Sequence, residues 1–460
     1  MRTVFAERLP ERLPEQLPEG LAERLGAAKA AAAPERLGMV QSIVGLGVDA
    51  VGLDAAIGDL VTVGGAAGVP AEVVATSRTG VRCMPLGSLT GIRAGTPVRA
   101  TGKRFTVPTG RGLLGRVLNG MGEPIDGKGP LTGGTGVGLG AVPLDNVSPP
   151  ALQRTRITEP LQLGVRAMDT LTTVGKGQRM GLFAGSGVGK SSLLSMIARG
   201  TDAAVSVIAL VGERGREVRE FLEDDLGAEG LARSIVVVST SDEPALMRMR
   251  AAFVATRIAE SFRDEGRDVM LMMDSLTRVA MAQREIGLSV GEPPATRGYP
   301  PSTFSLLAQL LERAGTGATG SVTGIYTVLV DGDDHNEPIA DTARSILDGH
   351  VVLDRVLAVA GHFPSIDPLA SVSRVASRVT SPEQAKTASA LRKMLAARRK
   401  AQDLIDVGAY QKGTNRLVDA ALEHEDAINS FLQQGMAEQS PSVQSWDRLN
   451  RVVANSGVLQ

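Results

Sequence analysis

Residues 181–194 read GLFAGSGVGKSSLL, and this stretch decides the fold of the chain. Apolar residues lead into a glycine-rich loop, and Lys190, Ser191 and a helical continuation follow. Glycines let successive backbone N–H groups turn inward and form a nest for an anion at a helix N-terminus. A lysine so placed reaches the β- and γ-phosphates of a nucleotide, and the serine hydroxyl coordinates Mg²⁺. The stretch therefore predicts a strand, a phosphate-binding loop and a helix.

The motif departs from its strict form at the first position, where Ala184 replaces glycine. Alanine is small enough for a relaxed form of the loop, and the alternative is an ordinary glycine-rich turn at a helix start. The residues expected to bind the nucleotide phosphates are Gly185, Ser186, Gly187, Val188, Gly189, Lys190, Ser191 and Ser192.

Length and composition limit the class of protein. The 460 residues suffice for about three domains. A net charge of −1 gives no global positive field for nucleic acid or an anionic membrane. The single cysteine, Cys83, excludes a disulfide framework, fits a reducing cytosol, and is expected to be a small buried hydrophobe. No apolar run approaches membrane-spanning length, and charged residues stand where a signal peptide needs an apolar core, so we expect a soluble protein.

The N-terminal part divides into two segments. Residues 1–38 carry the recurring tetrapeptides ERLP, ERLP, EQLP, EGLA and ERLG. Their prolines would break a helix, so this segment predicts a disordered tail, with a partner-binding amphipathic segment as the alternative. Residues 39–109 contain short β-rich runs separated by Gly and Pro, which predict a small β-barrel. Basic and aromatic residues do not alternate on these runs, so a nucleic-acid-binding barrel would lack its stacking platform.

The remaining chain predicts a core and a helical domain. Residues 110–140 form a Gly-rich connection that opens the core, and apolar strands then alternate with helical stretches as far as residue 380. This alternation predicts an α/β domain with a mostly parallel sheet covered on both faces. Residues 381–460 predict a C-terminal helical domain, with helical periodicity over residues 383–406, 416–434 and 443–453.

Two acidic residues follow apolar strand-like runs, Glu213 in VGERGREV and Asp274 in VMLMMDSLTR. The carboxyl ends of parallel strands meet at one edge of a sheet, so Glu213 is expected beside the phosphates, where it polarises an attacking water. Asp274 fits the carboxylate that holds water on Mg²⁺ opposite Ser191. The alternatives are a charged helix start for Glu213, because arginines follow it, and an ordinary strand end for Asp274.

Arg374 lies in HFPSIDPLASVSRVA, distant in sequence from the loop. A phosphoryl-transfer site needs an arginine to neutralise transition-state charge, and a neighbouring subunit can supply it. From the sequence alone, an ordinary surface or ion-paired arginine is the simpler interpretation. The histidines show no metal-binding spacing and are expected to be structural: His335, His350, His362 and His424. The acidic run DGDDHNEP, residues 331–338, predicts a polar loop at the sheet edge.

Six longer stretches carry a resemblance to a known family. They read GSGVGKSSLL, VGERGREVREF, LMMDSLTRVAMAQREIGL, GEPPATRGYPPSTFSLLAQLLERAG, VDGDDHNEPIADTARSILDGHVVLDR and PSIDPLASVSR. Residues 39–434 resemble the flagellum-specific and type III secretion ATPases, relatives of the catalytic subunits of rotary ATP synthases. The resemblance implies a P-loop (RecA-like) core between the barrel and the helical domain, and a homohexamer with ATP sites between subunits.

The resemblance also implies a role for each site residue. Lys190 and Ser191 match the residues for phosphate and Mg²⁺, and Glu213 matches the catalytic carboxylate. Asp274 matches a second metal-site residue. Arg374 matches an arginine finger that one subunit donates to the site of its neighbour.

An adenine site and a set of partners are implied as well. Phe363 and Tyr410 align with the aromatic pair that holds adenine in the synthase relatives. The implied function is ATP hydrolysis at the cytoplasmic base of an export apparatus, where it releases chaperones from substrates, unfolds substrates or primes their entry. The implied partners are a peripheral regulator at the N-terminal region, a central stalk protein, the membrane export gate and substrate–chaperone complexes. The proline-broken ERLPERLPEQLPEGL departs from the continuous amphipathic helix that such a regulator would bind.

Several alternatives stay open at this point. VLVDGDDHNEPIAD and GLLGRVLNGMGEPIDGKGPL look more like flagellar members than injectisome members. A synthase catalytic subunit would need a different, non-catalytic partner subunit. A non-catalytic nucleotide-binding subunit should lack the carboxylate found at Glu213. A hexameric RNA translocase would need positive charge and stacking aromatics.

Overall fold

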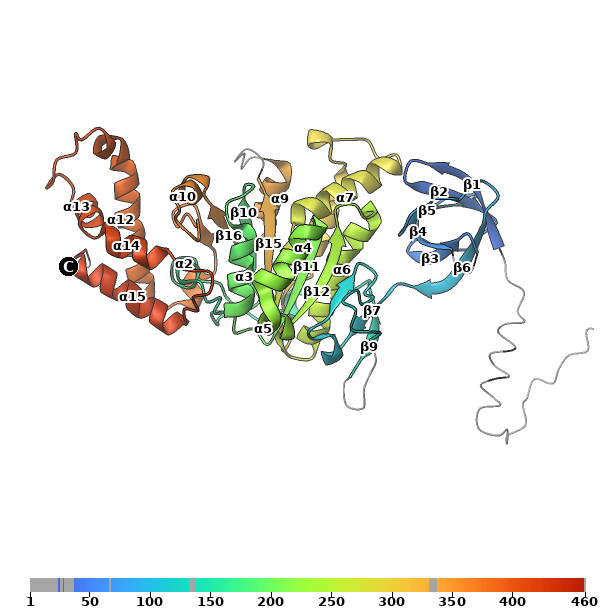
Figure 1. Cartoon of the computed structure of the whole chain (residues 1–460), viewed down its shortest axis with the longest axis horizontal. Coiled ribbons are helices and arrows are strands. Elements are labelled where there is room, and N and C mark those ends of the chain that lie inside the picture. The colour runs from blue at the N-terminus through green and yellow to red at the C-terminus, as the bar shows by residue number, and fades with distance from the viewer. Residues whose placement is uncertain are drawn as a thin grey trace, which may run out of the picture.

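The computed structural model describes residues 24, 28, 37–65, 68–131, 138–330 and 337–458. Figure 1 shows a β-barrel at one end, an α/β core in the middle and a helical domain at the other end. The fold prediction is therefore confirmed. The tetrapeptide repeats and most of the acidic run, including His335, lie outside the described residues. None of the helices described here has both the length and the apolar character needed to cross a lipid bilayer.

Six antiparallel strands close the barrel in the order β1-β2-β5-β4-β3-β6. They are β1 (Leu37–Val44), β2 (Gly47–Val51), β3 (Asp59–Val63), β4 (Val69–Thr76), β5 (Val81–Pro85) and β6 (Pro97–Arg104). Alternate residues point inward, so Val61, Val63 and Cys83 are fully buried in a small aliphatic core. The prediction that Cys83 is a buried hydrophobe is confirmed.

The connection from barrel to core differs from its prediction in two places. The barrel ends at Arg104, before the predicted residue 109, because β7 (Thr106–Thr109) pairs with β9 (Gly140–Pro143) in a separate ribbon. The Gly-rich connection also contains β8 (Val117–Asn119), which pairs with the edge of the main sheet. The high glycine content of this connection makes the strand difficult to recognise in the sequence, because only Leu118 and its neighbours in the strand contribute apolar side chains.

The core sheet has the order β17-β16-β10-β15-β13-β11-β12-β8, and β14 pairs outside this path with β15. Its other strands are β10 (Arg179–Ala184), β11 (Val205–Glu213), β12 (Ser234–Thr240), β13 (Asp268–Asp274), β14 (Gly315–Thr316), β15 (Ser321–Leu329), β16 (Gly349–Leu353) and β17 (Val372–Ser373). All pairings are parallel except those of β14 and β17. The predicted mostly parallel sheet is confirmed.

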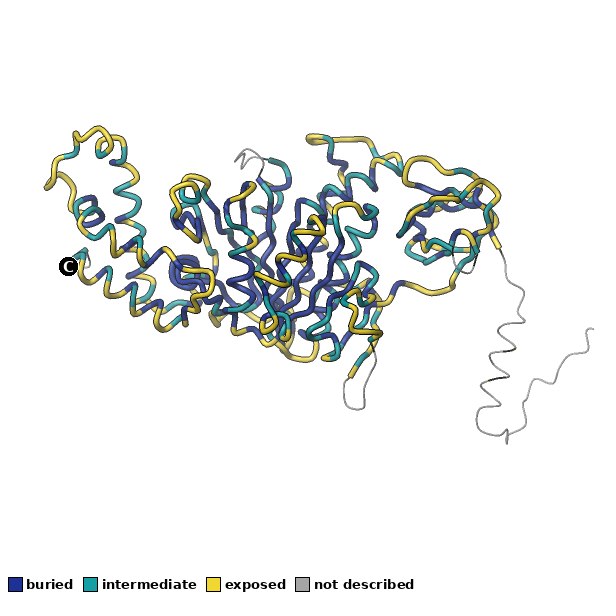
Figure 2. The backbone as a smooth tube through the Cα atoms, viewed as in Figure 1, coloured by how far each residue is buried: buried dark blue, intermediate teal, exposed yellow. Residues whose placement is uncertain are grey.

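Both faces of this sheet are covered, as Figure 2 shows by the continuous buried colour of its strands. On β13, Met270 and Met272 belong to one apolar cluster, and Leu271 and Met273 belong to the other. Burying a side chain of this size stabilises the fold by about 1.5–3 kcal/mol. The core helices are α2 (Arg166–Leu171), α3 (Lys190–Gly200), α4 (Gly215–Glu220), the π-helical η3 (Phe221–Leu226), α5 (Gly227–Ala232), α6 (Ala245–Asp264), α7 (Leu276–Ser289), α8 (Pro301–Glu312), α9 (Pro338–Ile346), α10 (Arg355–Val359) and α11 (Ala376–Val379).

The C-terminal domain contains α12 (Pro382–Asp406), α13 (Arg416–Glu423), α14 (Glu425–Leu432) and α15 (Ser442–Asn455). Helix α12 starts at a capping box between Ser381 and Gln384, which satisfies orphan backbone groups of its first turn. The predicted helical stretch 416–434 is two helices, because the chain leaves helical geometry at His424. The buried Arg166 fastens this domain to the core, since it donates to the carbonyls of Phe431 and Gln433.

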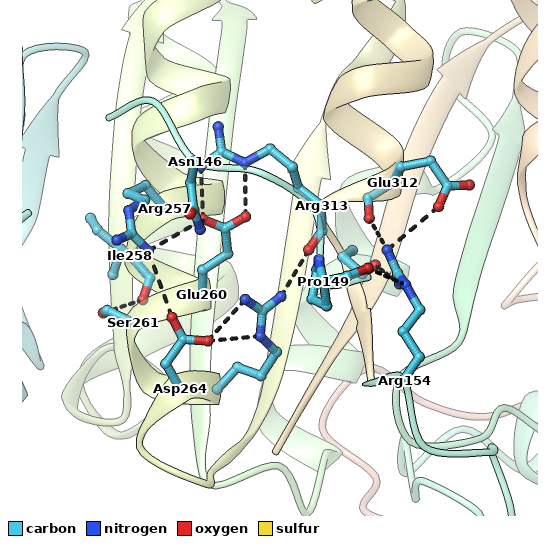
Figure 3. A network of polar contacts seen from close by, with 12 residues as sticks. Asn146, Pro149, Arg154, Arg257, Ile258, Glu260, Ser261, Asp264, Glu312 and Arg313 are labelled. Carbon is cyan, nitrogen blue, oxygen red and sulfur yellow. Dashed lines mark hydrogen bonds and ion pairs between the residues drawn. The ribbon is translucent and has the colours of Figure 1, made fainter. Parts of the chain in front are cut away.

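A buried ion-pair network holds the segment after β9 against the core (Figure 3). Glu260 on α6 is fully buried, and its carboxylate accepts hydrogen bonds from Arg313 Nε at 2.8 Å and Asn146 Nδ2 at 2.8 Å. Arg154, farther along the same segment, donates to the carbonyl of Ala314 at 2.9 Å. The entry into the core is thereby tied to α6 and to the end of α8.

Candidate active site

The loop predicted to bind phosphate lies between β10 and α3. Strand β10 ends at Ala184, and α3 begins at Lys190. Gly187 has φ of 76° and Gly189, the N-cap, has φ of 91°, so both adopt backbone that favours glycine. The strand, loop and helix are therefore confirmed, and Ala184 fits as the last strand residue.

A cavity of about 530 Å³ opens beside this loop. Its lining residues are Ala184, Gly185, Ser186, Gly187, Gly189, Lys190, Ser191, Ser192, Glu213, Arg214, Glu217, Arg278, Leu329 and Val330. Of the predicted phosphate-binding residues, Val188 alone is absent from the lining, because its side chain is buried in the core.

Three predicted site residues meet at the mouth of the loop. Lys190 Nζ lies 3.2 Å from Glu213 Oε1 and 2.6 Å from Asp274 Oδ1. The two carboxylates come from the carboxyl ends of β11 and β13, which are neighbours in the sheet. The predicted convergence of strand ends on the loop is therefore seen in the structure, and ordinary helix-start and strand-end roles do not account for it.

The backbone before Glu213 has a local irregularity that orients its side chain. The register of β11 against β12 shifts between Val211 and Glu213, and Gly212 between them has φ of 74°. A Cβ on Gly212 would stand 2.9 Å from Arg278 Cβ. Glycine is therefore required here both by the backbone angle and by the side chain that passes over it.

Asp274 is held from a second side. Thr327 on β15 donates its hydroxyl to Asp274 Oδ1 at 2.7 Å. Both residues are buried, so this bond fixes the orientation of the carboxylate that also accepts from Lys190. Thr327 interrupts the apolar run of β15, and that interruption is the sequence signal that could have identified it.

The electrostatics of the cluster are those of partly buried charges in contact. Burial, and then the nearby charge of Asp274, raise the pKa of Glu213 above its ordinary value of 4.5. Burial opposes the charge of Lys190, but the carboxylates of Asp274 and Glu213 outweigh it and raise the pKa of the lysine. The lysine is therefore charged at neutral pH, and Glu213 is a stronger base than a solvated glutamate.

The cavity contains three charged residues to which the sequence analysis gave no role, namely Arg214, Glu217 and Arg278. Hydrogen bonding with Glu213 lowers the pKa of Glu217, so these two carboxyl groups act on each other. No described residue accepts a hydrogen bond from the buried Nε of Arg278. Arg278 lies in the first turn of α7, the helix that follows the strand end at Asp274, and this closeness in the chain was the available signal.

The segment around Phe363 contacts the phosphate loop. Ser365 is buried and donates its hydroxyl to the carbonyl of Val188 at 2.6 Å. A Cβ on Gly189 would stand 3.5 Å from the ring of Phe363, so this half-exposed ring lies next to the loop. The prediction that Phe363 contacts a bound base is compatible with this place.

Tyr410 lies elsewhere. With residues of α12 and Val418 of α13 it lines a separate hollow, and its hydroxyl donates to Asp419 Oδ1 at 3.0 Å. The structure does not bring Tyr410 to the loop cavity, and its role at adenine stays a prediction. Other residues of the C-terminal domain do contact the Phe363 segment; among them is Gln434, whose backbone N donates to the carbonyl of Phe363 at 2.9 Å.

Arg374 stands at the outer edge of the sheet, directly after β17. Its side chain is exposed, does not line the loop cavity, and donates to the carbonyl of Arg344 at 3.2 Å. The structure does not bring it to Lys190 of the same chain, and its role as an arginine finger for a neighbouring site stays a prediction.

Ser191 and Asp274 are the residues predicted to hold Mg²⁺. Ser191 is exposed and lines the cavity at the start of α3, and Asp274 is buried at the end of β13, where its carboxylate accepts from Lys190. Among the described residues, no group of three or more His, Cys, Asp and Glu side chains forms a metal cage. Mg²⁺ in phosphate-transfer sites is held by one or two side chains together with substrate phosphates, so this arrangement fits the ion.

Comparison with known proteins agrees with this geometry. Residues 164–373 match the nucleotide-binding domain of the ATP synthase alpha/beta family, and residues 40–102 match its beta-barrel domain. Residues 380–451 match the T3SS EscN ATPase C-terminal domain. The flagellum-specific ATP synthase of Bacillus subtilis is 50% identical over 425 residues, which are 92% of this chain and 96% of that protein. The chain belongs to the type III secretion branch of the ATP synthase alpha/beta family.

Two solved structures of this family have the same fold. The assembled ATPase EscN of the enteropathogenic E. coli type III secretion system superposes with a TM-score of 0.85 at 43% identity, covering 90% of this chain and 100% of that chain. EscN in complex with its central stalk EscO gives a TM-score of 0.83 at 42% identity, with coverage of 90% and 100%. The family resemblance found in the sequence is confirmed over the barrel, the core and the helical domain.

Proposed function

We propose that this chain hydrolyses ATP and thereby energises protein export by a flagellar type III secretion apparatus. The observation that carries the hydrolytic part is the contact of Lys190 with Glu213 and Asp274 at the mouth of the phosphate loop. A phosphate loop alone binds nucleotide, whereas a basic carboxylate beside it supplies what turnover requires. The export part is supported by similarity to flagellum-specific relatives over nearly the whole chain.

In this proposal each side chain has a defined task. The backbone N–H groups of the loop and the Lys190 ammonium bind the β- and γ-phosphates. Glu213 polarises the water that attacks the γ-phosphate in line, a task helped by its raised pKa. Ser191 and Asp274 would hold Mg²⁺, which neutralises phosphate charge when it is bound. Phe363 packs against the adenine.

The site is completed by a second copy of the chain. Arg374 is exposed at the sheet edge and does not reach its own loop cavity. In a homohexamer, we propose, it enters the neighbouring site and stabilises the charge of the transition state. The EscN structures are of an assembled ATPase, which supports this oligomeric arrangement.

The proposed partners follow the export role. They are a central stalk protein, as in the EscN complex with EscO, a peripheral regulator, the export gate and substrate–chaperone complexes. The chain would work in the cytoplasm, peripheral to the inner face of the cell membrane at the base of the apparatus. No role for nucleic acid is proposed.

The purified full chain tests the enzymatic part. It is expected to hydrolyse MgATP without RNA and without a second type of subunit, and Glu213→Gln is expected to bind ATP without turnover. Strict dependence on RNA would favour a translocase, dependence on a different partner subunit would favour a synthase, and unchanged turnover in Glu213→Gln would favour a non-catalytic subunit. In cells, Glu213→Gln at normal expression should abolish export of flagellar filament protein.

The second candidate is the ATPase of a virulence injectisome. The structural match to EscN favours it, because EscN serves such a system. Loss of effector secretion with intact flagella in the Glu213→Gln strain would decide for this alternative. The position of the gene among flagellar or virulence genes would give the same answer.

A further inference from the structure

Arg374 is held at two points by one short stretch of its own chain. Its guanidinium donates to the carbonyl of Arg344 at 3.2 Å, and its backbone N donates to the carbonyl of Asp348 at 3.0 Å. Arg344 lies in the last turn of α9, where helix carbonyls lack partners within the helix and attract cations. The contacts with residues 344–348 therefore set the position of Arg374 at both its backbone and its guanidinium.

The same stretch is attached to β10, the strand that leads into the phosphate loop. The Arg344 guanidinium carbon lies 5.0 Å from the centre of the Phe183 ring. Phe183 is fully buried and immediately precedes Ala184, the last strand residue before the loop. Asp348 accepts a hydrogen bond from Arg179 Nε at 3.0 Å, at the other end of the strand.

The Phe183 ring has a fixed position. A Cβ on Gly181 would stand 2.4 Å from this ring, so the ring folds back over its own strand. His350 on the neighbouring β16 meets it edge to face at 5.6 Å. The ring therefore links the loop end of β10 to the guanidinium of Arg344.

We propose that Arg344 is a positioning residue for Arg374, the arginine that a subunit donates to its neighbour. Through Arg344, the position of a subunit's own phosphate-loop strand determines where that subunit holds Arg374. This inference rests on the proposed donation of Arg374 between subunits. Arg344 does not line the loop cavity, so it has no direct contact with nucleotide in its own chain.

The first measurement separates turnover from binding. Arg344→Met keeps the length and much of the bulk of the side chain but removes the cation from the aromatic ring. We expect kcat of the assembled protein to fall about three- to tenfold, the range that loss of one cation–π contact supports. The affinity of the dilute, unassembled subunit for ATP is expected to stay within twofold. Arg451→Met, at an exposed arginine of α15, is the matched control and should change neither quantity.

Mixed assemblies then decide which site Arg344 serves. Lys190→Ala subunits have a defective loop and an intact Arg374, and Arg374→Ala subunits have the reverse. If Arg344 positions Arg374, Lys190→Ala subunits restore activity to Arg344→Met subunits, and Arg374→Ala subunits do not. The opposite pattern, with rescue only by Arg374→Ala subunits, would show that Arg344 acts on its own loop and would overturn the inference.

Two controls keep the outcomes separate. Lys190→Ala mixed with Arg374→Ala must recover activity, and failure here would refute the donation of Arg374 itself rather than the role of Arg344. If Arg344→Met does not assemble in sedimentation velocity, Arg344→Lys replaces it, because lysine keeps the charge but loses the planar stacking. Full activity of an assembled Arg344→Met protein would also refute the inference.

Discussion

Lys190 and Asp274 form a close ion pair, with the ammonium nitrogen 2.6 Å from Asp274 Oδ1. They come from the first residue of α3 and the last residue of β13, which are 84 positions apart in the chain. The pair keeps the lysine charged and at the mouth of the loop, where a ligand phosphate competes with the carboxylates for it.

Lys190→Ala is expected to reduce ATP hydrolysis by at least about 10²-fold, because the bound phosphates lose their charged partner. It also leaves Glu213 and Asp274 close together without a cation. Steady-state hydrolysis measures the change in turnover, and equilibrium binding of a fluorescent ATP analogue measures the change in nucleotide affinity. Lys176→Ala, at a lysine that pairs with Glu159 and Asp268, is the matched control and should retain turnover.

Glu213 predicts the pH dependence of turnover. Its pKa is raised above 4.5, so the acid limb of the profile of kcat/KM should fall above that pH. The same shift affects stability, because protonated Glu213 favours the folded state. This contribution to the free energy of unfolding is fully present below pH 4.5 and is lost as pH rises through the folded-state pKa. Glu213→Gln removes the carboxylate that polarises the attacking water, so it should abolish turnover. It also removes a partly buried charge, so it should raise Tm at pH 7. An unchanged or lower Tm would contradict this assignment.

Arg374→Ala is expected to reduce turnover of the assembled protein by about 10³–10⁵-fold and to leave ATP binding by the dilute subunit intact. Activity per subunit of the wild-type protein should fall on dilution below the assembly concentration. Activity that is independent of concentration would show that each subunit has a complete site.

Glu260→Ala is expected to lower the free energy of unfolding by about 3–5 kcal/mol, since it leaves the buried Arg313 without its counter-ion. Glu285→Ala removes a more exposed partner, paired with Arg248, and should cost at most about 1 kcal/mol. Urea unfolding curves of both variants test the difference. Equal losses would mean that the network of Figure 3 does not stabilise the core.

Cys83 should be unreactive in the folded protein. Burial raises the pKa of its thiol to about 12, so almost no thiolate is present at pH 8. Reaction with a chromogenic disulfide should be slow in buffer and fast in denaturant, and its rate should report opening of the barrel. Rapid labelling of the native protein would show that the barrel core is open to solvent.

The sequence best predicted those residues whose role depends on their immediate neighbours in the chain. The glycine spacing before Lys190 determines the loop, and an apolar run that ends in Asp274 determines a strand end at the correct edge of the sheet. Thr327 and Ser365 were missed because their roles come from contacts across the fold, with Asp274 and with the carbonyl of Val188. The break that Thr327 makes in the apolar run of β15 marks the residue, but no periodicity in the chain gives its partner.

The family resemblance had a similar limit. It located Phe363 beside the loop, where the structure has it, but the structure does not bring Tyr410 there. The segment after α12 departs from a regular element, and alignment through such a loop does not determine which side chain faces the core. The strand β8 was missed for a related reason, since its short apolar run is enclosed by glycines.

The short segment around Ser365 touches two domains at once. Ser365 donates to the phosphate loop at Val188, Asp367 accepts from Arg399 of α12 at 2.8 Å, and Phe363 accepts from the backbone of Gln434. Coupling between two sites through such a link is reciprocal. A force on the C-terminal helices and a ligand in the phosphate loop would therefore act on the same short segment of chain.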